Sequence, residues 1–217
     1  DLILSGERWV KENFNLFGGL TDYSFVEGVM GLFDGIGSSS KGSTAELAKV
    51  LDLPVVLIVD ASGKAASIAA LIKGFRDHDK ELKIAGVVLN NVQTLRHEKI
   101  LLEVLDQINI KSLGSLPPCK DLHLPTRHLG LAPAHEILQL EIKIEKWASI
   151  AKEYLDIESF KKLLLAPKSN HKKCNFLPRK DSGFIHPIAI AEDNAFHFRY
   201  QETKELLEEN GMPTITW

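Results

Sequence analysis

Short apolar runs rich in β-branched residues recur along the chain, and each is followed by small or polar residues that favour a turn. The clearest runs are Tyr23–Val26, Pro54–Asp60 and Ile84–Leu89, and a weaker one covers Ser112–Leu116. Unbroken apolar runs of this length are typical of strands that are buried on both faces of a sheet. We therefore predict that these runs form strands of a mostly parallel sheet.

Segments with helical spacing separate these runs. Ser43 or Thr44 can cap a helix that extends to Leu51. Further helices are predicted at Gly63–Phe75, Leu95–Ile108, Pro133–Tyr154 and Ile157–Leu165. Alternation of strands and helices indicates an α/β fold in which crossover helices flank the sheet.

Residues 166–186 differ in composition from the segments on either side. They contain five Lys or Arg residues against one acidic residue, with little apolar periodicity, which is typical of an interdomain linker. A strand at Ile188–Ala191, a helix at Gln201–Asn210 and a strand at Thr214–Trp217 are predicted after it. We expect residues 1–165 to form one domain and residues 187–217 to begin a second α/β domain.

Charge and cysteine content narrow the classes of function. The 26 Lys and Arg residues against 29 Asp and Glu residues give a net charge of −3, which provides no general attraction for nucleic acid. No apolar run reaches the roughly 20 residues that span a bilayer. Cys119 and Cys174 have neither metal-site spacing nor the density of a disulfide scaffold, which favours a reducing, cytoplasmic setting. We expect neither nucleic acid nor a membrane as a partner.

The segment Phe25–Gly35 joins the end of a predicted strand to a glycine-rich turn that carries Glu27 and Asp34. Ligands collect at the carboxyl ends of strands in an open parallel sheet. Two carboxylates there suit Mg²⁺ bound to phosphates, and Gly28 and Gly31 would let phosphates approach the backbone. The alternative is structural, with Glu27 capping the turn and Asp34 hydrogen-bonding its own backbone. Spacing alone does not decide between them.

Asp60 also ends a predicted strand. We therefore expect its carboxylate at the same edge of the sheet, beside a bound nucleotide. The alternative is that this carboxylate caps the helix that follows.

The string Val26–Gly35 closely resembles the signature of the cobyrinic and hydrogenobyrinic acid a,c-diamide synthases. Further matches to that family follow in order at Gly42–Ala48, Pro54–Ala61, Ala85–Asn90 and Leu124–Leu131. The resemblance covers roughly residues 1–136, and a thinner one covers residues 188–217, which resemble the opening of a glutamine amidotransferase domain.

This resemblance implies a P-loop NTPase fold of the dethiobiotin-synthetase type, with ATP and Mg²⁺ as cofactors. It also implies an ATP-dependent ligase that phosphorylates the a- and c-acetate carboxylates of a corrin, cobyrinic or hydrogenobyrinic acid. Ammonia from glutamine then displaces each phosphate. The sequence decides neither which corrin is the substrate nor whether the protein is a homodimer.

Site residues follow from the same resemblance. Glu27 would hold Mg²⁺ and act in catalysis with Asp34. Asn90 would read adenine through its amide, which both donates and accepts, and Pro117 would lie against the base; the alternative for Asn90 is that it only turns the chain. The substrate-binding residues would be Ser43, Thr44, Arg127 and His128, of which the last two would meet a corrin carboxylate or a phosphate. The alternative is structural, since a loop histidine is more often a surface or packing residue.

Two parts of such an enzyme are not found in the sequence. No segment fits the phosphate-binding pattern Gly-x-x-x-x-Gly-Lys-Ser/Thr, because Gly37–Ser43 has its glycine and lysine in the wrong order. Neither cysteine resembles a glutaminase nucleophile. We therefore expect an internal portion of the enzyme that is catalytically incomplete alone. A partition-type ATPase switch and a non-catalytic binding module remain the alternatives.

Overall fold

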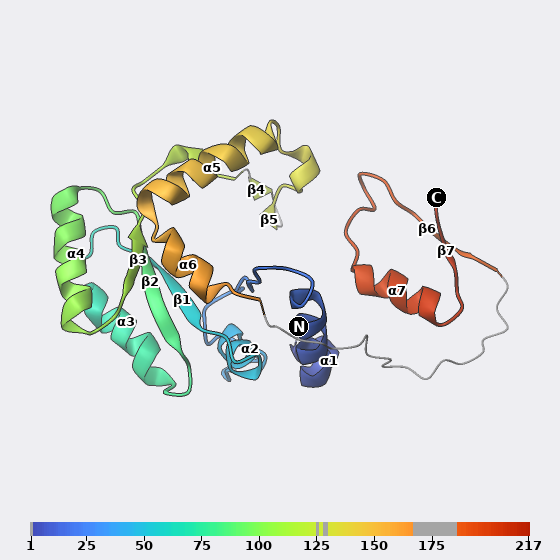
Figure 1. The fold of residues 1–217 in the computed structure, drawn as a ribbon, viewed down its shortest axis with the longest axis horizontal. Coiled ribbons are helices and arrows are strands. Elements are labelled where there is room, and N and C mark those ends of the chain that lie inside the picture. The colour runs from blue at the N-terminus through green and yellow to red at the C-terminus, as the bar shows by residue number, and fades with distance from the viewer. Residues whose placement is uncertain (1, 125, 128–129, 167–185) are drawn as a thin grey trace. The chain divides into compact units, whose positions relative to one another are not determined.

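The computed structural model describes residues 2–124, 126–127, 130–166 and 186–217 (Figure 1). The chain divides into two compact units, Asp1–His171 and Lys172–Trp217. One predicted substrate-binding residue, His128, lies outside the described residues.

The first unit is built on a parallel sheet of order β1-β2-β3 (Figure 1). Its strands are β1 (Val55–Asp60), β2 (Ile84–Asn90) and β3 (Ser112–Ser115). All three were predicted, and the α/β fold with a parallel sheet is confirmed. The apolar runs form strands because their side chains pack into a core: Val87 and Leu89 are fully buried on one face of β2, and Val88 on the other face is 4% exposed. The second face is less well covered at β1, where Ile58 is 74% exposed.

The main core lies where α3 (Ser67–His78) and α4 (Leu95–Gln107) pack against the sheet. Ile68 and Ile72 of α3 are fully buried, as is Leu101 of α4. A smaller cluster joins α2 (Thr44–Val50) to Leu82, just before β2. These helices were predicted because their apolar residues recur at helical spacing and face the core.

One predicted strand is wrong. Tyr23–Val26 forms no strand; only Tyr23 makes an isolated antiparallel bridge, to Leu165, and Ser24 N donates to Leu164 O at 2.8 Å. An apolar run becomes a strand only when a neighbouring backbone supplies a ladder of hydrogen bonds. In the described part of the chain, no strand lies next to Tyr23–Val26.

The predicted start of the long helix is also wrong. A short 3₁₀ turn, η2 (Ala134–Glu136), is followed by Gln139 with a positive φ of 54°, and only then does α5 (Leu140–Tyr154) begin. The apolar spacing continues through both parts, so periodicity could not reveal the break. The helix α6 (Ile157–Leu163) follows, with Asp156 as its N-cap.

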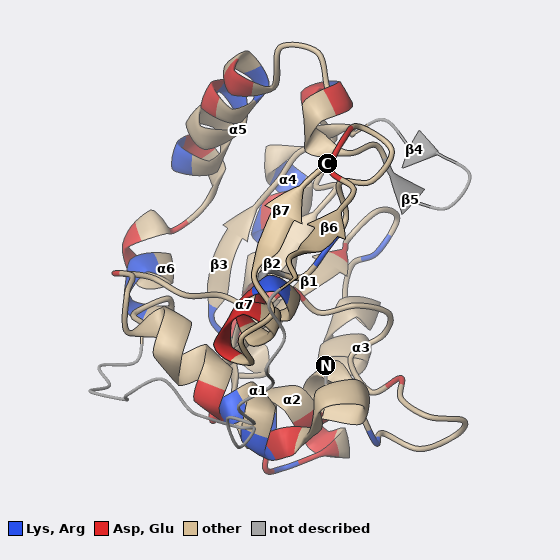
Figure 2. Ribbon diagram, turned by 90° about the vertical axis from the view of Figure 1, so that its right-hand side faces the viewer, with Lys and Arg blue, Asp and Glu red and all other residues tan. Residues whose placement is uncertain are grey.

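Several elements were not predicted. They are the helix α1 (Leu2–Gly18), the 3₁₀ turn η1 (Lys120–Leu122) and an antiparallel pair of two-residue strands, β4 (Thr126–Arg127) and β5 (Gly130–Leu131). Charges of both signs are mixed along the helices, as α1 and α5 show (Figure 2). None of the described helices is long and apolar enough to cross a membrane.

The second unit contains a β-α-β arrangement, as predicted. β6 (Ile188–Ile190) pairs in parallel with β7 (Thr214–Thr216), and α7 (Gln201–Glu209) connects them. Arg199 donates to the carbonyl of Phe196 at 2.8 Å and also to that of Ala191. These bonds hold the loop between β6 and α7.

Candidate functional site

The carboxyl ends of the three parallel strands place several predicted site residues at one edge of the sheet. Asp60 and Asn90 lie opposite each other in the register of β1 and β2. Leu116 N donates to Leu89 O at 2.8 Å, so the segment that enters Pro117 lies at the same edge. Asp60, Asn90 and Pro117 therefore meet where an open parallel sheet binds its ligands.

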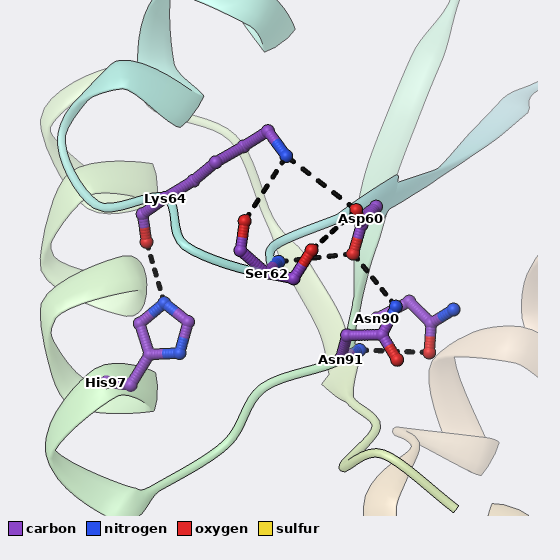
Figure 3. A network of polar contacts seen from close by, with 6 residues as sticks. All are labelled: Asp60, Ser62, Lys64, Asn90, Asn91 and His97. Atoms are coloured by element: carbon purple, nitrogen blue, oxygen red, sulfur yellow. Dashed lines mark hydrogen bonds and ion pairs between the residues drawn. The ribbon is translucent and has the colours of Figure 1, made fainter.

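Asp60 is the centre of a polar network at this edge (Figure 3). Its Oδ1 accepts from Asn91 Nδ2 at 2.8 Å and from Ser62 N at 3.1 Å. Its Oδ2 accepts from Ser62 Oγ at 2.7 Å and lies 3.7 Å from the Lys64 ammonium. Hydrogen bonds from Asn91 and then Ser62 lower the pKa of Asp60 to about 2, since they stabilise its charged form.

Three of these contacts are hydrogen bonds and the fourth, to Lys64, is an ion pair. The network therefore favours a role in which Asp60 orders the residues around it. A direct contact between Asp60 and a nucleotide stays a prediction.

Asn91 joins this network, although the sequence pattern did not single it out as a candidate. It has a positive φ of 61°, a conformation that asparagine tolerates better than most residues. Its backbone N–H donates to Asn90 Oδ1 at 3.0 Å while its side chain binds Asp60. The Asn-Asn doublet after an apolar strand was the available signal, because asparagine commonly ends strands in turns. Asn90 retains its amide donors and one acceptor lone pair.

His97, in the first turn of α4, joins a second segment to this network (Figure 3). Its Nε2 lies 2.7 Å from the backbone oxygen of Lys64. A carbonyl oxygen only accepts, so Nε2 carries the proton, and Nδ1 can accept from Gln93 N at 3.5 Å. Each ring nitrogen of His97 therefore has a backbone partner.

The turn that carries Glu27 and Asp34, which we call the acidic turn, lies outside the Asp60 network. Glu27 is exposed, whereas Asp34 Oδ2 accepts a hydrogen bond of 2.9 Å from Gly31 N. Asp34 N in turn donates to Gly31 O at 3.0 Å. For Asp34 the structural alternative is therefore realised in this structure. No hydrogen bond between described residues joins this turn to the Asp60 network.

The two predicted residues at the start of α2 contribute differently. Ser43 is 1% exposed, and its Oγ accepts from Glu46 N at 3.2 Å as the N-cap of α2. Thr44 Oγ1 donates to Val29 O at 3.4 Å, and this hydrogen bond stabilises the acidic turn. A Cβ added to Gly28 would come within 2.8 Å of Thr44 Cγ2, which explains a glycine there. Substrate binding by Ser43 and Thr44 stays a prediction, and the burial of Ser43 favours a capping role.

Arg127 lies in β4, and its side chain is outside the described set. Within the described residues, no group of three or more His, Cys, Asp or Glu side chains is arranged to hold a metal ion. Mg²⁺ that is bound to nucleotide phosphates needs only one or two protein carboxylates. The exposed carboxylate of Glu27 fits that requirement.

The parallel sheet with flanking helices and polar strand ends has the architecture of P-loop-type nucleotide-binding domains, which other α/β domains share. In agreement, a family model described as an AAA domain matches residues 20–126. No solved structure matches the chain.

Curated relatives of this chain share one kind of name within the class of nucleotide-binding domains. A cobyrinate a,c-diamide synthase from Caldanaerobacter subterraneus is 42% identical, covering 99% of this chain and 47% of the relative. One from Synechococcus is 38% identical over 100% of this chain and 48% of the relative, and a hydrogenobyrinate a,c-diamide synthase from Brucella ovis is 42% identical over 83% and 41%. The chain thus spans about half the length of these relatives. The resemblance seen in the motifs is confirmed: this chain is a relative of the cobyrinate and hydrogenobyrinate a,c-diamide synthases.

Proposed function

We propose that the chain is part of an enzyme that amidates the a- and c-acetate carboxylates of cobyrinate or hydrogenobyrinate, using ATP, Mg²⁺ and ammonia from glutamine. The observation that carries this proposal is the similarity to such synthases along almost the whole chain. The cluster of polar strand ends around Asp60 and Asn90 supports a nucleotide site.

The chemistry requires activation because a free carboxylate does not condense with ammonia in water. Transfer of a phosphoryl group to the carboxylate makes its carbon electrophilic and supplies a leaving group. Ammonia then forms the C–N bond and phosphate departs. Mg²⁺ supplies positive charge against the phosphate oxygens when it is bound.

Glu27 is the residue that we propose as the Mg²⁺ ligand. Its carboxylate is exposed in a turn that Thr44 and the Asp34–Gly31 hydrogen bonds hold in shape. Asp34 then acts by fixing the turn that carries Glu27. Gly28 keeps the turn close to Thr44, because a side chain there would collide with it.

Asn90 is proposed to read the adenine base. Its amide can donate to a ring nitrogen and accept from the exocyclic amine, while Asn91 fixes its orientation through Oδ1. Pro117 at the same edge offers an apolar surface for the base. Arg127 is proposed to pair with a corrin carboxylate through its fixed positive charge.

The second unit is proposed to be part of a glutamine amidotransferase domain, and the protein is proposed to act in the cytoplasm. Support for the first of these is the match to relatives that continues through residues 187–217. A homodimer is a further proposal, which the mass of the protein in solution tests.

The decisive experiment supplies the full-length protein with Mg-ATP, either corrin and either glutamine or ammonia, and detects products by mass spectrometry. We expect two successive amidations of one corrin or both, each dependent on ATP. Absence of any amidated product from both corrins, with either nitrogen source, would refute the proposal.

A further inference from the structure

His97 connects the segment after β2 to the segment after β1, and both strands end at the proposed nucleotide site. It lies in the first turn of α4, where its backbone N–H donates to the Thr94 cap at 3.1 Å. Its Nε2–H reaches 2.7 Å to the carbonyl of Lys64, in the segment between β1 and α3. A half-buried imidazole is thus anchored at both its backbone and its ring.

The contact continues from Lys64 to the strand ends (Figure 3). The Lys64 ammonium lies 3.4 Å from Ser62 O and 3.7 Å from Asp60 Oδ2. Asp60 in turn holds Asn91, and Asn91 N–H holds Asn90 Oδ1. His97 binds the backbone of Lys64, whereas the Lys64 ammonium makes the contacts to Ser62 and Asp60, so the two sets are joined through the covalent structure of Lys64. The backbone gives a second connection, because Lys64 N donates to Ala61 O at 3.0 Å and Ala61 N donates to Asn90 O at 2.8 Å.

We propose that His97 is a positioning residue for nucleotide binding, acting through Lys64 and the Asp60 network without touching the ligand. The inference rests on the proposed nucleotide site. Loss of the His97–Lys64 bond would free the turn at residues 61–64, and Asp60 and Asn90 would then hold their geometry for a smaller fraction of the time. Nucleotide would bind more weakly, because only the ordered arrangement is competent.

Two amide substitutions provide a matched test. His97→Gln keeps an N–H donor at about the reach of Nε2, whereas His97→Asn carries the same amide one methylene shorter. His97→Ala removes the donor. Lys99→Ala, on an exposed position of the same helix, is the control for changes to α4 itself.

In the full-length protein we expect His97→Ala and His97→Asn to raise the KM for ATP about tenfold, the effect of one lost hydrogen bond. Their kcat, and their KM for corrin and glutamine, should stay within about twofold. His97→Gln should recover most of the affinity for ATP, and Lys99→Ala should match the wild type. Titration with a fluorescent ATP analogue should give the same order of affinities.

Unchanged ATP affinity in His97→Ala would overturn the inference. A parallel loss of kcat and of every KM, with no recovery in His97→Gln, would overturn it as well, since that pattern reports general loss of structure. Wild-type protein that binds nucleotide but amidates no corrin refutes only the reaction, and the same order of nucleotide affinities then supports the role of His97. Wild-type protein that binds no nucleotide overturns both.

Discussion

The side-chain amide of Asn91 donates a hydrogen bond of 2.8 Å to Asp60, which precedes it by 31 residues. The bond ties the end of β1 to the turn after β2. It is also the first cause of the low pKa of Asp60, which lies at about 2 compared with an ordinary value of 3.8.

Asp60 should make the protein sensitive to acid. Because its pKa is lowered in the folded state, its contribution to the free energy of unfolding is present above about pH 4 and is lost as the pH falls through about 2. Asp60→Asn should therefore reduce the fall in the urea unfolding midpoint between these pH values. It should also weaken ATP binding, since the network loses its charged centre.

Asp156 provides the control for this prediction. Hydrogen bonds from Ser159 lower its pKa to about 2 as well, but it caps α6, away from the Asp60 network. Asp156→Asn should reduce the acid sensitivity and leave ATP affinity unchanged. Identical acid sensitivity in the wild type and Asp60→Asn would contradict the assignment.

Glu27→Gln should strongly reduce turnover with little effect on stability. The side chain is exposed, so its removal disturbs no core packing, but the neutral amide is a poor Mg²⁺ ligand. We expect a loss of about 100-fold or more in ATP-dependent amidation. Glu103→Gln, an exposed carboxylate on α4, should behave as the wild type. Full activity in Glu27→Gln would remove Glu27 from the site.

Gly28→Ala should damage the acidic turn through a steric conflict. The new Cβ would lie 2.8 Å from Thr44 Cγ2, which is closer than real Cβ contacts allow. We expect a loss of about 1–3 kcal/mol in the free energy of unfolding, together with reduced activity. Thr44→Ser removes the opposing methyl group, so the double variant should recover part of both losses. Additive losses in the double variant would show that the conflict lies elsewhere.

Gly114→Ala should be strongly destabilising. Gly114 has a φ of 138°, and an added Cβ would meet Leu155 Cδ2 at 2.7 Å and would also meet the Tyr154 carbonyl. Strain and overpacking together should lower the free energy of unfolding by roughly 3 kcal/mol. Gly74→Ala is the matched control, because Gly74 lies within α3 with open space around it. It should raise stability by about 0.5–1 kcal/mol, as measured by urea unfolding.

Apolar periodicity was a good guide for the elements that bury a face in the main core. It found β1, β2, α3 and α4 because each contributes to the same core. It failed at Tyr23–Val26, where a similar run has no neighbouring ladder among the described residues, and at Gln139, where a positive φ ends the helical path without a change in apolar spacing.

The sequence by itself determined the α/β class, the presence of Asp60 and Asn90 at strand ends, and the resemblance to corrin a,c-diamide synthases. These follow from local burial patterns and from motifs read directly along the chain. Only the tertiary structure decided that Asp60 accepts hydrogen bonds from Asn91 and Ser62 and pairs with Lys64, and that His97 binds the Lys64 carbonyl. The reason is physical: the His97–Lys64 contact joins residues 33 positions apart, and their approach depends on how α3 and α4 pack on the sheet.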